Sequence, residues 1–198
     1  MRFSRKRRQQ VHLPPYTDEV LARITEAFPD QVSPVASVDW PTASVGREAL
    51  LDVCRFLRDD LGFAFLTDLT GVDWLGRTDR TPDQARFEVV YHLFSLTHNR
   101  RMRLKVRVPE SDPHVASVVE LWPTANFHER EVFDFYGVIF DGHPNLTKIL
   151  TADFMEGHPL RKDFPLGDEE IWDEEGGSIV QQPGSYRVTG PEGVRRFQ

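Results

Sequence analysis

The chain has 198 residues, 39% of them hydrophobic and 28% charged, which suits one domain with extensions or two very small domains. Its net charge of −7 argues against a nucleic-acid-binding protein, because such proteins gain affinity by neutralising phosphates with Lys and Arg. The single cysteine, Cys54, excludes an internal disulfide, a CxxC redox pair and an iron–sulfur cluster held by this chain's own thiolates.

Charge is concentrated near both ends of the sequence. Residues 2–8 contain five bases, and residues 168–175 contain six acids. Runs of like charge are usually solvated tails. No apolar run follows the basic start or reaches the length of a membrane span, so we expect neither a secretion signal nor a membrane anchor. We predict an N-terminal arm (1–30), a domain (31–137), and an extended interface segment with an acidic tail (138–198).

Two helices are predicted in the first third of the chain. Thr17–Phe28 has apolar residues on one face behind a capping threonine. Val45–Leu61 gives a stronger signal, because its apolar residues recur at spacings of three and four until Gly62 ends the pattern. Cys54 lies on that apolar stripe, so we expect a small buried hydrophobe rather than a reactive thiol.

Three strands are predicted next, at Phe63–Leu69, Arg86–Leu96 and Arg103–Val108. The last of them alternates strictly between apolar and basic residues, as a strand with one buried face does. Thr97–Arg101 suits a hairpin turn between the second and third strands. The predicted fold class is therefore α+β, with helices packed on a small, mostly antiparallel sheet.

The chain changes character after Pro109. Val115–Leu121 is predicted as a short helix ended by Pro123, and Thr124–Tyr136 as a second helix ended by Gly137. From Val138 onward the periodicity disappears, and large apolar residues stand alone among Gly, Pro and charged residues. We expect an extended irregular segment, which covers these residues either by wrapping over its own domain or by lying on another protein.

Two similar motifs occur in that segment, Asp141-Gly-His-Pro144 and Glu156-Gly-His-Pro159. Glycine permits unusual backbone angles, and each proline restricts itself and the histidine before it. Such motifs stiffen a chain that has little secondary structure. The histidines and nearby aspartates resemble metal ligands superficially, but neither HxxxH nor CxxC spacing is present, so we favour hydrogen-bonded histidines.

The helix predicted at Thr124–Tyr136 has a charged face. Arg130 and Asp134 are four residues apart and can pair along it, while Glu131 and Asp134 share a face. Paired carboxylates can perform acid–base chemistry. The alternatives are a solvated surface and a set of charges buried at an interface, where each ion needs a partner.

Two runs, EREVFDFYGVIFDGHPNLTKIL (Glu129–Leu150) and EGHPLRKDFPLG (Glu156–Gly167), carry a family resemblance. Together they resemble the signature of the 30-kilodalton subunit of respiratory complex I. The first run departs from the family pattern at Thr147, where a basic residue is usual. The resemblance extends more loosely over the predicted strands and over the Trp122–Phe127 stretch, covering roughly two-thirds of the chain.

The resemblance implies a non-catalytic, cofactor-free peripheral-arm subunit of proton-translocating NADH:quinone oxidoreductase. FMN, the iron–sulfur clusters, NADH and quinone would be used by other parts of that complex. Its expected partners are the quinone-site subunit (49 kDa type) and the subunit that carries the terminal cluster. The complex alone would hold it at the cytoplasmic face of the cell membrane, or at the matrix side in an organelle, and its last third would be buried on these neighbours. The residues expected to contact them are Glu129, Arg130, Glu131, Asp134, Gly137, Gly142, His143, Pro144, Lys148, His158, Pro159, Arg161, Lys162 and Asp163.

Three alternatives stay open from the sequence. The first is the equivalent subunit of a membrane-bound hydrogenase or of another donor:quinone complex. The second is a stand-alone acid–base or metal enzyme that uses Glu131, Asp134 and the histidines in a concave pocket. The third is a nucleic-acid adaptor that works through Arg2–Arg8, with binding that weakens steeply as salt rises.

Overall fold

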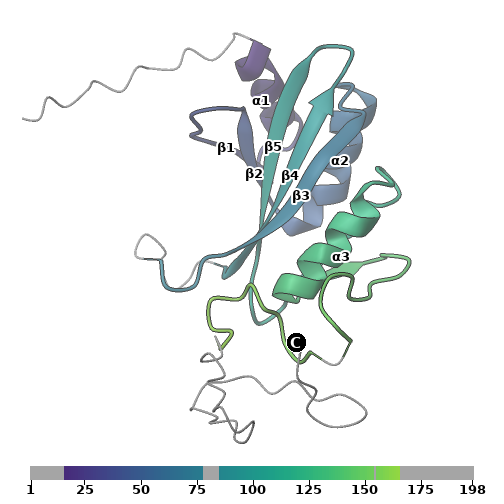
Figure 1. The fold of residues 1–198 in the computed structure, drawn as a ribbon. Helices are drawn as coiled ribbons and strands as arrows, with labels where there is room; N and C mark the ends of the chain where they lie inside the picture. The colour runs from purple at the N-terminus through teal and green to yellow at the C-terminus, as the bar shows by residue number, and fades with distance from the viewer. Residues whose placement is uncertain (1–15, 78–84, 154, 166–198) are drawn as a thin grey trace, which may run out of the picture.

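A five-stranded mixed sheet forms the centre of the molecule (Figure 1). The structure is a computed structural model that describes residues 16–77, 85–153 and 155–165. The strands lie in the order β1-β2-β5-β4-β3. Their bounds are Val32–Val35 (β1), Thr42–Val45 (β2), Phe65–Asp73 (β3), Phe87–Ser95 (β4) and Arg100–Val108 (β5).

The pairing of the strands confirms the predicted fold class. Strands β3, β4 and β5 form an antiparallel meander, with Asp73 opposite Phe87 and Phe87 opposite Val108. Strand β2 pairs with β5 in parallel, and β1 pairs with β2 antiparallel. The sheet is therefore mostly antiparallel, with one parallel junction in the middle.

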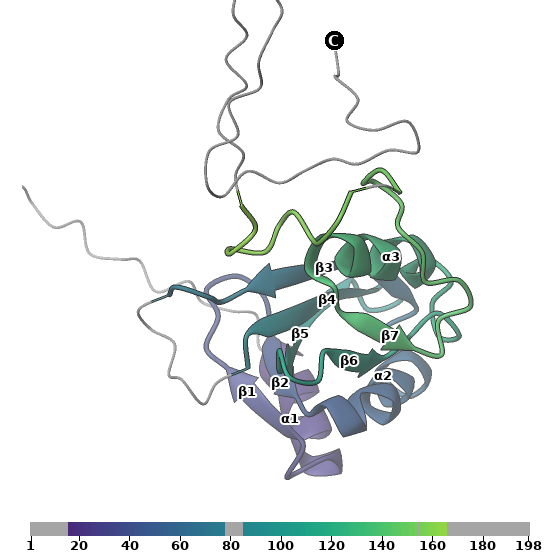
Figure 2. The same cartoon turned by 90° about the horizontal axis from the view of Figure 1, so that it is seen from below.

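Three helices lie on one side of this sheet (Figure 2). They are α1 (Tyr16–Ala27), α2 (Leu50–Asp59), which follows a single 3-10 turn (Arg47–Ala49), and α3 (Ala125–Tyr136). On β5 the apolar residues Met102, Leu104 and Val106 face the helices and are fully buried. The arginines and the lysine between them therefore face the opposite side of the sheet.

Helix α2 packs its predicted apolar stripe into the core. Leu50, Val53, Cys54 and Leu57 are each 0% exposed. Burial raises the pKa of the Cys54 thiol above its usual value, because an apolar site disfavours the thiolate. The prediction of a buried cysteine on the apolar stripe is confirmed.

Strands β1 and β2 and the segment around Val115 differ from the prediction. The two strands have four residues each, and the prolines around them hid the strand pattern. The helix predicted at Val115–Leu121 is wrong. Instead, His114–Ala116 forms strand β6, which pairs in parallel with β7 (Ile139–Asp141), and a turn follows.

The expectation for the segment from Val138 onward needs correction. Val138 and Phe140 are 1% and 2% exposed and belong to the domain's own core, and Phe140 lies in β7, which pairs with β6. Strand β7 thus continues the packing across the predicted boundary at residue 138. Leu150 and Leu160, in contrast, are 61% and 47% exposed. The basic start, the acidic tail and Trp172 lie outside the described residues.

Candidate functional site

The C-terminal end of helix α3 is held by residues far along the chain. We call residues 142–153 and 155–165 the docked segment. Four backbone carbonyls at a helix end lack partners within the helix. Here Gly137 satisfies one, and the second Gly-His-Pro motif with its flanking residues satisfies three. The donors and acceptors are Gly137 N to Phe133 O (2.8 Å), His158 Nδ1 to Asp134 O (2.9 Å), Leu160 N to Phe135 O (3.2 Å) and Arg161 Nε to Tyr136 O (2.7 Å).

Gly137 is required at this junction for two reasons. Its φ of 74° lies in the left-handed region, which ends the helix and which other residues adopt only under strain. A Cβ at this position would also clash with the His158 ring and lie 2.5 Å from Nη2 of Arg161. The second motif can therefore approach α3 only where a side chain is missing.

Asp134 fixes the middle of the docked segment from inside the domain. Its side chain is 0% exposed. Oδ2 accepts hydrogen bonds from the backbone N–H groups of Ile149 (3.0 Å), Leu150 (2.8 Å) and Thr151 (2.9 Å), and Oδ1 accepts one from the Thr151 hydroxyl. Burial works against the charged form, but these four donors together hold the pKa of Asp134 below its usual value.

Arg130 binds the segment one turn earlier and does not pair with Asp134 as predicted. Its Nε donates to the Thr147 carbonyl (3.0 Å), and Nη2 donates to the Thr147 hydroxyl (3.1 Å) and to the Lys148 carbonyl (3.0 Å). Thr147, the position at which the chain departs from the family pattern, thus supplies an acceptor that a basic residue would lack.

The first Gly-His-Pro motif is anchored through its histidine. His143 Nε2 lies 3.1 Å from the Asn126 carbonyl, and its Nδ1 accepts a hydrogen bond from the Asn145 N–H at 3.0 Å. These contacts assign the neutral tautomer with the proton on Nε2. Both motif histidines, His143 and His158, are therefore hydrogen-bonded to backbone, as predicted.

Arg86 fixes the last described part of the docked segment. Its side chain is 2% exposed, and its guanidinium donates two hydrogen bonds to the Asp73 carboxylate, at 2.8 and 3.1 Å. Its Nη1 also donates to Glu110, and both Nη1 and Nη2 donate to Asp163. Lys162 donates its backbone N–H to Asp73 at 2.8 Å. The hydrogen bonds from Arg86 hold the pKa of Asp163 below its usual value.

Glu129 stabilises the turn after β6. It is 0% exposed, and its carboxylate accepts hydrogen bonds from the Ser117 hydroxyl and the Val118 N–H, both at 2.7 Å. Burial disfavours the ionised form more strongly than these two donors favour it, and raises the pKa of Glu129 to about 7.

An acid–base or metal site is not assembled from the residues considered for it. Among the described residues no group of three or more His, Cys, Asp or Glu side chains is placed to hold a metal ion. Asp134 has both carboxylate oxygens occupied by donors of the docked segment, whereas Glu131 is partly exposed.

In the described part of the chain, no helix has both the length and the apolar character to cross a bilayer.

Comparison with known proteins assigns a family. Residues 43–170 match the family model described as "Respiratory-chain NADH dehydrogenase, 30 Kd subunit". The chain belongs to this family. It is 50% identical over 157 residues to an NADH-quinone oxidoreductase subunit of Roseiflexus castenholzii (77% of this chain, 86% of the relative) and 42% identical over 178 residues to the subunit of the same name in Acidothermus cellulolyticus (87% and 89%).

A solved structure agrees with this membership of the 30-kilodalton subunit family. The trypsin-resistant fragment (1–134) of Nqo5 has a TM-score of 0.58 and 34% identity, with 65% of this chain and 98% of the fragment covered. A chain of a membrane-bound sulfane sulfur reductase has a TM-score of 0.65 at 24% identity, covering 86% and 99%. The second likeness shows a shared fold alone.

In this family member, the fourteen residues expected to contact partners divide into two groups. Several act within the chain: Arg130, Asp134, Gly137, His143, His158 and Arg161 shape or hold the docked segment, Lys148 Nζ donates to the Met155 carbonyl, and Glu129 holds the turn after β6. Others face outward wholly or in part: Glu131, Gly142, Pro144, Pro159, Lys162 and Asp163. Contact with a partner stays a prediction for both groups.

Sequence reasoning missed Asp73, Arg86 and Glu110. Each stands alone in the sequence with no motif around it, and the folded sheet brings them to Asp163, 77 positions after Arg86. Arg86, the first residue of a predicted strand, was the one available signal, because a charged residue at a strand end is often paired when it is buried.

Three exposed apolar side chains mark the outer surface of α3 and the docked segment. Phe127, Leu150 and Leu160 are 63%, 61% and 47% exposed, among six large hydrophobic residues exposed in the described part of the chain. Exposed apolar side chains on a rigidly held backbone suit a protein interface better than a solvated surface.

Proposed function

We propose that this chain is the cofactor-free peripheral-arm subunit of a proton-translocating NADH:quinone oxidoreductase, complex I. Its role is structural: it presents the docked segment to neighbouring subunits and performs no electron or proton transfer. The observation that carries this proposal is the docked segment itself, which is pinned in one shape yet keeps Leu150 and Leu160 on the outside.

The rigid backbone supports a docking role on energetic grounds. Ordering a loop on binding costs free energy, and a loop already held by its own domain avoids most of that cost. Asp134, Arg130 and Arg86 hold three successive parts of the segment. A partner therefore meets a preformed surface, to which the outward residues of the segment contribute the contacts.

The expected partners are the quinone-site subunit (49 kDa type) and the terminal-cluster subunit. FMN, the iron–sulfur clusters, NADH and quinone are bound by other subunits in this proposal. The complex holds the chain at the cytoplasmic face of the cell membrane, or at the matrix side in an organelle. The relatives are named as subunits of NADH-quinone oxidoreductase, which supports this assignment.

Substitution of the exposed leucines tests the docking role. Leu150→Ser with Leu160→Ser should reduce the amount of assembled complex in membranes, because the interface loses apolar area. Turnover per assembled complex should stay unchanged. Leu96→Ser is the matched control, since Leu96 is 62% exposed on the β4–β5 hairpin. Reduced turnover with intact assembly would contradict a purely structural role.

Purification of the intact complex distinguishes complex I from the related membrane complexes to which this chain could belong. The chain is purified from membranes in mild detergent, and the co-migrating chains are identified by mass spectrometry. Co-purification with a flavin-carrying, NADH-oxidising subunit is the expected result. Co-purification with hydrogenase subunits instead would assign the chain to a related membrane complex.

A further inference from the structure

The side of the sheet that faces away from the helices carries aromatic and basic side chains. His92 and Phe94 of β4 lie opposite Arg103 and Arg101 of β5 and point to this side, since their neighbours point into the core. Helices α1, α2 and α3 all lie on the other side (Figure 2). We call this surface the open face.

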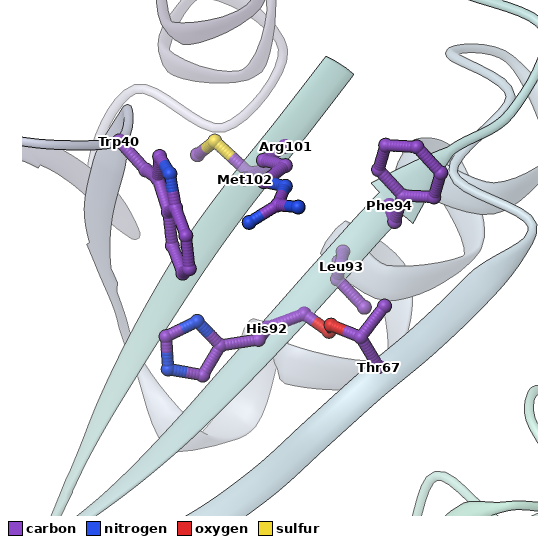
Figure 3. A pocket seen from close by; sticks show the side chains of 7 residues that line it. All are labelled: Trp40, Thr67, His92, Leu93, Phe94, Arg101 and Met102. Carbon is purple, nitrogen blue, oxygen red and sulfur yellow. The ribbon is translucent and has the colours of Figure 1, made fainter. Parts of the chain in front are cut away.

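A shallow hollow lies in the open face (Figure 3). Its volume is about 150 Å³, and it is lined by Trp40, Thr67, His92, Leu93, Phe94, Arg101 and Met102. The Trp40 and His92 rings meet edge to face, with centroids 5.3 Å apart. A largely apolar cavity of roughly 150 Å³ is large enough to hold a benzene ring. The hollow therefore has the size and lining for one aromatic side chain.

A row of bases runs along β5 beside the hollow. Arg101, Arg103, Lys105 and Arg107 occupy alternate positions of the strand. Asp39 pairs with Arg103, and Glu88 pairs with Lys105 and Arg107. Arg101 is exposed and lies over the Trp40 and Phe94 rings at 4.8 and 5.9 Å, and no acid among the described residues pairs with it.

Charge and side-chain type point to one occupant within this chain. Residues 168–175 read DEEIWDEE, which places six acids around Ile171 and Trp172. We propose that this acidic segment lies on the open face of its own molecule, with Trp172 in the hollow and its carboxylates along the base row. Acids around an aromatic side chain match bases around an aromatic-lined hollow.

The length of chain between the two sites permits this contact. Arg86 holds Asp163 directly before β4 begins at Phe87. The hollow lies five to seven residues further along β4, at His92–Phe94, or roughly 17–24 Å at the rise of a strand. The nine residues from Asp163 to Trp172 span at most about 30 Å when extended. The segment can therefore reach the hollow without leaving its anchor.

A spin label on the full chain tests the contact by NMR. Ser178→Cys places a nitroxide three residues beyond the acidic run, while Cys54 stays unlabelled because it is 0% exposed. The amide signals of His92, Phe94 and Arg101 should lose intensity in the wild-type background. The loss should shrink at about 1 M salt, where the Debye length falls to about 3 Å.

Two substitutions and a mixing experiment decide the outcome. Arg101→Glu and Trp172→Ala should each restore the lost intensity, whereas Arg55→Glu, an exposed base on α2, should not. Full intensity at His92, Phe94 and Arg101 in the wild-type background would overturn the proposal, as would an equal loss with Arg101→Glu. In the mixing experiment, isotope-labelled chains without the nitroxide are combined with nitroxide-labelled chains without the isotope. Loss of the same signals in this mixture would also overturn the proposal, because the contact would then join two molecules.

Discussion

Gly137 joins the end of α3 to the second Gly-His-Pro motif. Its substitution has two costs, which are backbone strain and a steric clash with His158 and Arg161, and these can be measured separately. Gly137→Ala should lower the free energy of unfolding, because it adds about 1 kcal/mol of left-handed backbone strain and forces His158 and Arg161 away. Gly142→Ala is the matched control, since Gly142 also has a positive φ, of 85°, but a Cβ there meets nothing within 4 Å. Urea denaturation of both variants measures the difference.

The larger loss should occur at position 137. Equal losses for the two variants would show that the close approach of His158 and Arg161 contributes nothing beyond the backbone strain.

Glu129 should make stability depend on pH. Its pKa is raised by burial from 4.5 to about 7 in the folded chain. The folded state therefore holds the proton more tightly than the unfolded state. The resulting contribution of Glu129 to the free energy of unfolding is complete below pH 4.5 and is lost as pH rises to 7. The loss amounts to about 3 kcal/mol at 1.36 kcal/mol per pKa unit.

Comparison with Glu129→Gln isolates this contribution. The glutamine keeps an acceptor for the Val118 N–H but cannot ionise. Between pH 4.5 and 7, the unfolding free energy of wild type should fall relative to the variant. The comparison cancels the effects of His158 and Asp134, whose pKa values are also shifted. Parallel curves would show that folding does not raise the pKa of Glu129.

At the scale of elements, the Arg86 cluster should control how firmly the end of the docked segment is held. Asp163→Asn removes one carboxylate from Arg86 and should speed amide hydrogen exchange at Leu160 and Lys162. Asp153→Asn is the control, because Asp153 is exposed and lies in the same segment. Unchanged exchange in the Asp163 variant would show that the Asp163–Arg86 ion pair does not hold this end of the segment.

The sequence predicted those helices and strands in which the spacing of apolar residues is itself distinctive. Helix α2 and strand β5 follow from the spacing of Leu50, Val53 and Leu57 and from the alternation after Arg103. Strand β6 did not follow, because a short apolar run around Val115 fits a helix and a strand equally well and only its pairing with β7 decides.

The candidate site was predictable in its outline but not in its contacts. The two motifs and α3 mark the docked segment in the sequence, and the resemblance placed them in a family. The partners of Asp134 and Arg86 depend on where the fold returns the chain. Burial of Glu129 was likewise not readable, since a charged helix face shows no sign of which carboxylate points inward.

For the whole molecule, protection from exchange should extend past the predicted boundary at residue 138. The Gly137 and Ile139 amides donate to Phe133 and Pro113 carbonyls at 2.8 Å each, beside the buried Val138 and Phe140. In the isolated chain these amides should exchange as slowly as those of α3. Fast exchange from Val138 onward would mean that this part of the domain folds only on a partner.

The parallel junction between β2 and β5 has a consequence for biosynthesis. The β1–β2 hairpin finishes at Val45, yet its partner on the sheet, Arg103–Val106, is translated about sixty residues later. Until the ribosome has released that stretch, the hairpin has no neighbour and the central layer cannot close. A truncated product that lacks the hairpin would leave the β2-facing edge of β5 without a backbone partner, and an unpaired strand edge favours pairing with another nascent chain.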